Sequence, residues 1–208
     1  MQEHEYTLLG GYNRAYVGRH LAIISAAISA AVILMLLWLV DLAERLGLPA
    51  NIPPAVLSLA SAGFIFTVLY WLFNRYAWRW PLIMRLLGVP DLSGTWKCHG
   101  KSLDQKGRIA HEWTGTITIV QRWEKIRLRL KTEKSGSNSV AAALLRDEVD
   151  GYKLLYHYKN DPLASQPQLT SHRGFAELVF TKNLTEADGE YFNGQTRFTF
   201  GSMHLERL

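Results

Sequence analysis

Polar and aromatic side chains alternate along the C-terminal half of the chain in a pattern that suits ligand binding. If Tyr156 faces inward on a strand, so do Tyr158 and Asn160, because alternate residues of a strand share a face. Aromatic faces stack on bases, and hydroxyl, amide and guanidinium groups hold phosphate oxygens. A planar, anionic, nucleotide-like ligand fits this inventory; the alternative is a filled barrel whose tyrosine hydroxyls are satisfied at the rim. The predicted pocket residues are Thr132, Ser137, Ser139, Tyr156, Tyr158, Asn160, His172 and Arg197.

Sequence motifs for catalysis are missing. The sequence has no G-x-S-x-G elbow, no glycine-rich phosphate loop that opens a helix, and no H-E-x-x-H. Its seven histidines have no partner ligands at metal spacing, and its single cysteine, Cys98, excludes a disulfide framework. We therefore expect a protein that is not an enzyme and that needs no metal or other cofactor.

The pocket residues fall in strand-like segments. Residues 126–131 alternate apolar and basic without a fault, so one face is buried and the other is wet. Similar runs occupy residues 94–101, 111–123, 140–149, 152–160, 173–182, 190–200 and 202–207. Short turns between them predict an all-β, antiparallel, eight-stranded up-and-down β-barrel over residues 91–208, similar to lipocalins in architecture.

Three cations stand at alternate positions of one predicted strand, Arg127, Arg129 and Lys131. They face outward if the aliphatic residues between them face the core. A solvated face is the simplest interpretation. Contact with anionic lipid headgroups or with an acidic partner is the alternative.

The first third of the chain is different in composition. Apolar residues make up 48% of the 208 residues, which excludes a disordered chain. They are concentrated in residues 21–40 and 55–73, and each run has the roughly 20 residues that an α-helix needs to cross a hydrocarbon core. A break at Pro53 and Pro54 predicts a hairpin of two transmembrane helices within residues 21–74. The predicted organisation adds an N-terminal flank, residues 1–20, and a juxtamembrane linker, residues 75–90, before the barrel.

Basic residues in the short flanks predict the orientation of this hairpin. Cytoplasmic flanks carry an excess of Lys and Arg. The loop has only Arg45, whereas the other two flanks have more, so both termini and the barrel are expected in the cytoplasm. The basic residues of the two outer flanks are Arg14, Arg19, Arg75, Arg79 and Arg85.

Small residues repeat at four-residue spacing in the first apolar run, among them Ser25 and Ser29. In lipid, such rows favour close helix packing and interhelical hydrogen bonds. Packing within one hairpin and packing between chains are equally compatible with the pattern.

Short motifs occur in a fixed order along the whole chain. They are Leu92-x-Gly94-x-Trp96, Gln121-x-Trp123-x-x-Ile126, Thr132-Glu133-x-Ser135, Tyr156-x-Tyr158-x-Asn160-x-Pro162, His172-x-Gly174 and Gly189-x-Tyr191-Phe192-x-Gly194-x-x-Arg197. Together with the predicted architecture, this order resembles the SMODS-associating two-transmembrane, β-strand-rich effectors of bacterial CBASS anti-phage systems, which have a STING-like β-barrel.

The resemblance implies a function. In such systems a cGAS-like nucleotidyltransferase, a CD-NTase, makes a cyclic nucleotide. The resemblance implies that the cytosolic barrel binds a cyclic dinucleotide, with a cyclic trinucleotide as second choice. It further implies that the protein forms a homo-oligomer on activation, that it disrupts the lipids of the bacterial inner membrane, and that the infected cell dies. The alternative is a membrane-tethered, lipocalin-like barrel that binds or acts on a lipid or another small apolar ligand.

Overall fold

The computed structural model describes residues 3–10, 13–49, 51–147, 149, 151–162, 171–194 and 199–208. The chain forms two compact units. One comprises Met1–Gly11 with Pro81–Leu208, and the other comprises Tyr12–Trp80. The second unit is therefore inserted into the sequence of the first.

The inserted unit is helical and begins with the long helix α1, Arg14–Arg45. The Asn13 side chain caps α1 by accepting from the Ala15 N–H (2.9 Å), as N-cap residues do. In the part of the chain that the structure describes, α1 is the one helix long and apolar enough to cross a membrane. The remaining elements of this unit are α2 (Pro54–Leu59), α3 (Ala62–Arg75) and the 3₁₀-helix η1 (Ala77–Arg79).

The second apolar run is divided into two helices rather than one. Helix α2 ends at Leu59, and Ser61 caps α3 by accepting from the Phe64 N–H (3.3 Å). A serine hydroxyl competes with the helical hydrogen bond at such a position and favours a helix start. The buried Ser29 hydroxyl donates to the Ala60 carbonyl beside this break (2.6 Å), so this small residue serves packing within one hairpin.

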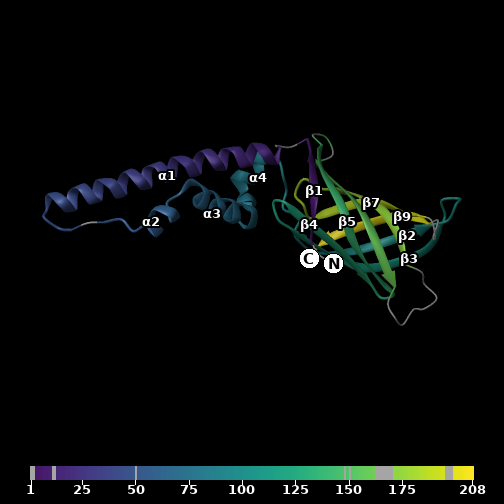
Figure 1. Cartoon of the computed structure of the whole chain (residues 1–208). Helices are drawn as coiled ribbons and strands as arrows, with labels where there is room; N and C mark the ends of the chain where they lie inside the picture. The colour runs from purple at the N-terminus through teal and green to yellow at the C-terminus, as the bar shows by residue number, and fades with distance from the viewer. Residues whose placement is uncertain are drawn as a thin grey trace. The chain divides into compact units, whose positions relative to one another are not determined.

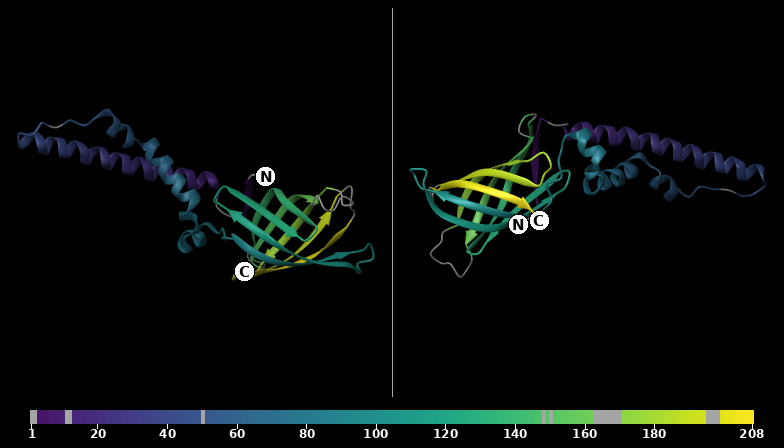
Figure 2. Two further views of the ribbon diagram at one scale, coloured as in Figure 1. Left: turned by 90° about the horizontal axis from the view of Figure 1, so that it is seen from below. Right: turned by 180° about the vertical axis from the view of Figure 1, so that it is seen from behind.

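In its described residues, the other unit contains the short helix α4, Pro81–Leu87, and nine strands that close into a barrel (Figures 1 and 2). The ring order is β1-β4-β3-β2-β9-β8-β7-β6-β5, and neighbours from β2 to β9 are antiparallel. The strands are β1 (His4–Leu9), β2 (Gly94–Leu103), β3 (Ile109–Gln121), β4 (Lys125–Thr132), β5 (Ser135–Asp147), β6 (Gly151–Pro162), β7 (His172–Phe180), β8 (Glu186–Asn193) and β9 (Phe200–Arg207).

The predicted count of eight strands is corrected to nine, because β1 comes from the N-terminal flank. Strand β1 is antiparallel to β4 at His4 and parallel to β5 from Tyr6 to Leu9. Strands β4 and β5 pair directly only at their other end, around Leu130 and Ser137, so β1 fills the gap between them. The flank gave no sign of a strand because only one of its six strand residues, Tyr6, is buried.

One buried amide ties β1 to the segment before β2. Gln121, at the end of β3, accepts the Leu92 N–H (2.9 Å) and donates to the Pro90 carbonyl (3.1 Å) and the Tyr6 hydroxyl (3.2 Å). The Tyr6 hydroxyl donates in turn to the Arg122 carbonyl (3.3 Å). Both chain segments that lead to the helical unit are thus held by the same side chain.

Replacing Gln121 by leucine is expected to lower the free energy of unfolding of the barrel by about 2–3 kcal/mol. The substitution leaves the Leu92 N–H and the Pro90 carbonyl buried without this partner, and each unsatisfied group costs about 1–3 kcal/mol. Denaturant unfolding in detergent, followed by tryptophan fluorescence, measures the change. Thr118→Ala, on the outer face of the same strand, is the control and should change little; equal losses in both variants would contradict the anchoring role.

Candidate ligand-binding site

The barrel interior changes character along the strands. At one end the inward residues are large, apolar and fully buried, among them Trp96, Trp123 and Phe180. The Trp96 ring packs edge-on against Phe180, with ring centroids 5.2 Å apart. Toward the other end the same strands continue with hydroxyl, amide, imidazole and aromatic side chains. One half of the barrel is therefore a packed core, and the polar half has room for a ligand.

The polar half contains a cavity of about 690 Å³. Ligand pockets range over roughly 300–1,000 Å³, so this cavity is of a size for a small ligand. Strands from β2 to β9 all contribute to its lining. The polar lining residues that matter below are Ser102, Thr132, Lys134, Ser137, Asn160, His172, Asn193 and Thr199.

Two pairs of aromatic rings line the cavity. Trp113 on β3 meets Tyr191 on β8 edge-on, with centroids 5.9 Å apart, and its indole N–H donates to the Tyr191 hydroxyl (3.2 Å). On β6, Tyr156 and Tyr158 are tilted neighbours, also with centroids 5.9 Å apart. The cavity thus has aromatic groups on two separate parts of its wall.

Glycines opposite two of these rings make room for them. A Cβ at Gly100 would collide with the Trp113 ring, and a Cβ at Gly174 would collide with the Tyr158 ring. Gly100 is the cross-strand partner of Trp113, and Gly174 is that of Tyr158. Each ring can therefore lie flat across the neighbouring strand, which keeps it along the wall of the barrel.

Hydrogen bonds fix the orientation of the aromatic groups. The Tyr158 hydroxyl donates to Asn193 Oδ1 (2.9 Å), and the Asn193 amide donates to the Thr199 hydroxyl (2.8 Å). Two residues earlier on β8, the Tyr191 hydroxyl is 2.7 Å from the Ser102 hydroxyl on β2. Such networks hold polar rings in one position before a ligand arrives.

The structure places six of the eight predicted pocket residues on the cavity wall: Thr132, Ser137, Tyr156, Tyr158, Asn160 and His172. Arg197 lies outside the described residues. Ser139 does not line the cavity; its buried hydroxyl accepts the Leu128 N–H (2.9 Å) and is 2.7 Å from His4 Nε2 on β1.

The Thr132 hydroxyl has a second task. It donates to the Ser135 carbonyl and accepts the Ser135 N–H, both at 3.1 Å, and so closes the turn between β4 and β5. Lys134, within this turn, also lines the cavity and supplies a cation to its wall. The prediction missed Lys134 because a charge in a turn is usually a solvated one.

Trp113, Tyr191 and Asn193 are cavity residues that the sequence prediction also missed. For Trp113 the sequence does contain an indication, because by alternation this residue shares a face with the buried Ile117 and Ile119. What could not be seen is that β3 extends the barrel wall past the core, so that its first inward ring meets the cavity.

Burial keeps two groups near the boundary between core and cavity uncharged. The pKa of Tyr156 is raised, first by burial and then by Tyr158 and Cys98 nearby. Burial raises the pKa of the Cys98 thiol to about 12. Tyr156 therefore stays neutral well above physiological pH, and it lines the cavity with little of its side chain exposed.

Cys98 is expected to resist thiol reagents in the native protein. With a pKa of about 12, only about one thiol in 10,000 is a thiolate at pH 8, and the thiolate is the reactive form. Titration with Ellman's reagent at pH 8 should show no fast reaction in detergent and one thiol per chain after denaturation. Fast labelling of the folded protein would show that the core end of the barrel opens.

Comparison with known proteins places the chain. Residues 87–207 match the family model described as "Cap15, cyclic dinucleotide receptor domain", and residues 15–79 match "Cap15, TM helices". The chain belongs to the Cap15 family. It is also 40% identical to "CD-NTase-associated protein 15" of Yersinia aleksiciae over 208 residues, which cover all of this chain and 99% of that protein.

The Cap15 match confirms the resemblance found in the sequence. Strands β2 to β9 lie within the Cap15 receptor domain, β1 lies outside both matched segments, and the inserted helical unit corresponds to the Cap15 transmembrane helices. The chain is thus a membrane protein of CBASS antiviral defence with a cyclic dinucleotide receptor domain. The cavity lies entirely within the residues of that receptor domain.

Proposed function

We propose that the protein is a CBASS effector whose barrel cavity binds a cyclic dinucleotide made by a CD-NTase. The observation that carries the proposal is the cavity itself, which combines two aromatic walls with hydroxyl, amide and cationic groups. A cyclic dinucleotide needs both kinds of contact, because it has two planar bases and two phosphates. A fatty acid has one anionic group and a long apolar chain, so it would place most of its length against polar side chains of this wall.

The bases would stack on the aromatic groups and the phosphates would meet the polar end. Trp113 and Tyr158 each have a glycine behind the ring and lie on separate strands, so each can offer a face to the cavity. Ser137, Lys134 and His172 supply donors for phosphate oxygens. Arg197, outside the described residues, remains a phosphate ligand proposed from the sequence alone.

Binding would activate the membrane unit. Helix α1, with the segment that contains α2 and α3, would cross the inner membrane twice and leave both termini in the cytoplasm, as the arginine distribution favours. A ligand shifts an equilibrium only by its differential affinity for the two states. Ligand-bound barrels would therefore associate more tightly, bring hairpins together as a homo-oligomer and disrupt the membrane, killing the infected cell.

Titration of the full-length protein in detergent with a panel of cyclic di- and trinucleotides tests the proposal. At least one cyclic dinucleotide should bind with saturable, one-site behaviour, measured by calorimetry. A linear dinucleotide of the same bases is the matched control and should bind much more weakly, because it pays more conformational entropy on binding. Binding of a fatty acid in place of every cyclic nucleotide would favour the lipid-binding, lipocalin-like alternative.

The same titration distinguishes a receptor from an enzyme. After prolonged incubation the cyclic dinucleotide should be recovered intact, as checked by chromatography and mass spectrometry. Conversion to a linear product that scales with protein concentration would contradict a purely receptor role.

A further inference from the structure

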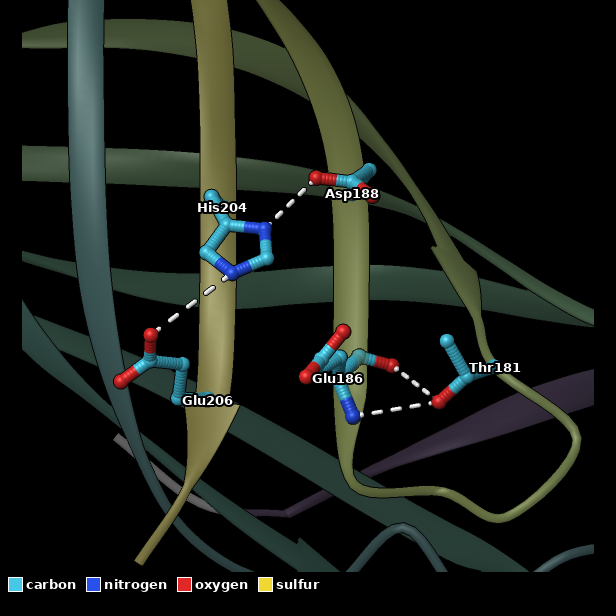
Figure 3. Close-up of polar contacts among 5 residues, drawn as sticks. All are labelled: Thr181, Glu186, Asp188, His204 and Glu206. Atoms are coloured by element: carbon cyan, nitrogen blue, oxygen red, sulfur yellow. Dashed lines mark hydrogen bonds and ion pairs between the residues drawn. The ribbon is translucent and has the colours of Figure 1, made fainter.

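The outer face of β8 carries a row of carboxylates. Glu186, Asp188 and Glu190 stand at alternate, exposed positions, and we call them the acidic row. The turn before the row is closed by Thr181, whose hydroxyl accepts the Glu186 N–H (3.1 Å) and donates to the Glu186 carbonyl (3.0 Å; Figure 3). The start of the row is thus fixed by the fold.

Two further carboxylates flank the acidic row. Glu206 on β9 is the cross-strand partner of Glu186, and Glu177 on β7 is that of Glu190. Like charges that lie directly opposite one another on a sheet are destabilising. The fold therefore concentrates negative charge on this face at a cost in stability.

Cations compensate only part of this charge. His204 Nδ1 lies 2.7 Å from Asp188 Oδ1 and its Nε2 lies 3.8 Å from Glu206 (Figure 3). The hydrogen bond with Asp188 is the first cause that raises the pKa of His204. Lys153 pairs with Glu177 (2.9 Å), and Lys97 on β2 is the cross-strand partner of Glu206. Within the described residues, neither Glu186 nor Glu190 makes an ion pair.

The outer face of β4 carries the opposite charge at the same spacing. Arg127, Arg129 and Lys131 also stand at alternate outward positions, and we call them the basic row. Their cross-strand partners on β3 are Val120, Thr118 and Thr116, and on β5 Arg129 and Lys131 face Asn138 and Gly136. None of these partners is acidic, and among the described residues Arg129 and Lys131 form no ion pair.

The two rows are matched in length and lie on opposite sides of the barrel. In the ring, β4 and β8 are separated by three strands, β3, β2 and β9, on one side. Three alternate residues span about 14 Å of strand in each row. Because the rows face away from each other, they cannot pair within one barrel, but the acidic row of one copy can meet the basic row of another.

Apolar groups accompany both rows. Phe192 continues the acidic row along β8 and is 56% exposed; it stacks on Phe175, with ring centroids 5.6 Å apart, and faces Phe200 across the sheet. Beside Arg127, on β3 and β5, Val120 and Val140 are each 40% exposed. An aromatic anchor next to charged groups is typical of protein interfaces.

We propose that the β8 face of one copy of this chain docks on the β4 face of a second copy. Such a head-to-tail contact uses two different surfaces, so it can be repeated and produces rings or open rows of barrels. Aligning Phe192 with Val120 brings Glu190 toward Arg129 and Asp188 toward Lys131, because the spacing of the two rows is equal. This contact specifies which surfaces meet when copies of the chain assemble in the proposed function. It depends on the proposed function only for the ligand that triggers assembly.

A charge exchange tests this contact. Arg129→Glu and Glu190→Lys each place like charges in the interface and should weaken association of the full-length protein at least tenfold. The chain with both substitutions restores an opposite pair at every interface and should associate within about threefold of the original. Light scattering coupled to size-exclusion chromatography in a neutral detergent, with and without the cyclic dinucleotide, measures this. Full association of both single variants, or no recovery in the double variant, would overturn the proposal.

Two further measurements distinguish an effect on self-association from an effect on ligand binding or on lipid binding. Neither residue lines the cavity, so at concentrations too low for association calorimetry should give all three variants the original ligand affinity. If the original protein binds no cyclic nucleotide, the proposed trigger fails, whereas self-association at high concentration still reports on the contact. Assembly in vesicles with and without phosphatidylglycerol is the second measurement. An effect of Arg129→Glu confined to the anionic vesicles, with none of Glu190→Lys, would assign the basic row to lipid and overturn docking.

Discussion

Replacement of both Trp113 and Tyr158 by alanine is expected to weaken cyclic dinucleotide binding by more than about 30-fold. Loss of one stacking partner costs about 1–3 kcal/mol per base, and the two rings lie on separate parts of the cavity wall, so both bases are affected. Trp113 is half-buried and Tyr158 is 8% exposed, so the substitution also removes packing along the barrel wall. Calorimetry gives the affinity, and circular dichroism shows whether the barrel remains folded.

The matched control keeps the rings and removes their polar atoms. The chain with Trp113→Phe and Tyr158→Phe loses the hydrogen bonds to Tyr191 and Asn193 but retains two aromatic faces. It should therefore keep most of the affinity. If the phenylalanine variant loses as much as the alanine variant, the polar atoms of these side chains recognise the ligand and stacking is not the main contact.

Tyr6→Ala is expected to lower the free energy of unfolding of the barrel by about 3–5 kcal/mol, the range for truncating a buried aromatic residue. Tyr6 is 2% exposed and is the buried residue through which β1 joins the interior. Its hydroxyl also bonds Gln121 and the Arg122 carbonyl. Denaturant unfolding followed by tryptophan fluorescence measures the loss.

Thr7→Ala is the neighbouring control, because Thr7 is exposed on the same strand and should tolerate the change. A loss below about 1 kcal/mol for Tyr6→Ala would show that β1 lies on the barrel without stabilising it. The eight strands β2–β9 would then form the complete folding unit, as the sequence alone predicted.

Local pattern predicted where most strands lie and named six of the residues that line the cavity. Strands β2 to β7 and β9 overlap the predicted runs, whereas β8 begins and ends earlier in the chain than the run predicted at 190–200. Tyr156, Tyr158, Asn160 and His172 were assigned to one interior by alternation. Alternation works here because each strand has one buried face and a short turn to the next strand.

The remaining features depend on contacts between distant parts of the chain. Ser139 has the same parity as Ser137 and was assigned to the pocket, but β1 covers it, and the pairing of β1 with β5 leaves no trace in local periodicity. The register of β5 also shifts between Ser139 and Ala141, so residues before and after that point reach the interior with different parity. A bulge of this kind is set by the partner strand.

The insertion of the helical unit between β1 and the other strands has a consequence for biosynthesis. Strand β1 leaves the ribosome before α1, whereas its partners around Ile126 and Ala142 follow more than a hundred residues later. At about 5–20 residues per second, β1 waits on the order of ten seconds for them. During that time α1 has already been made and is available for insertion into the lipid. In the proposed two-pass topology, the barrel gains its ninth strand only after both ends of the helical unit are on the same side of the membrane, so completion of the receptor would act as a check on the topology of its own anchor.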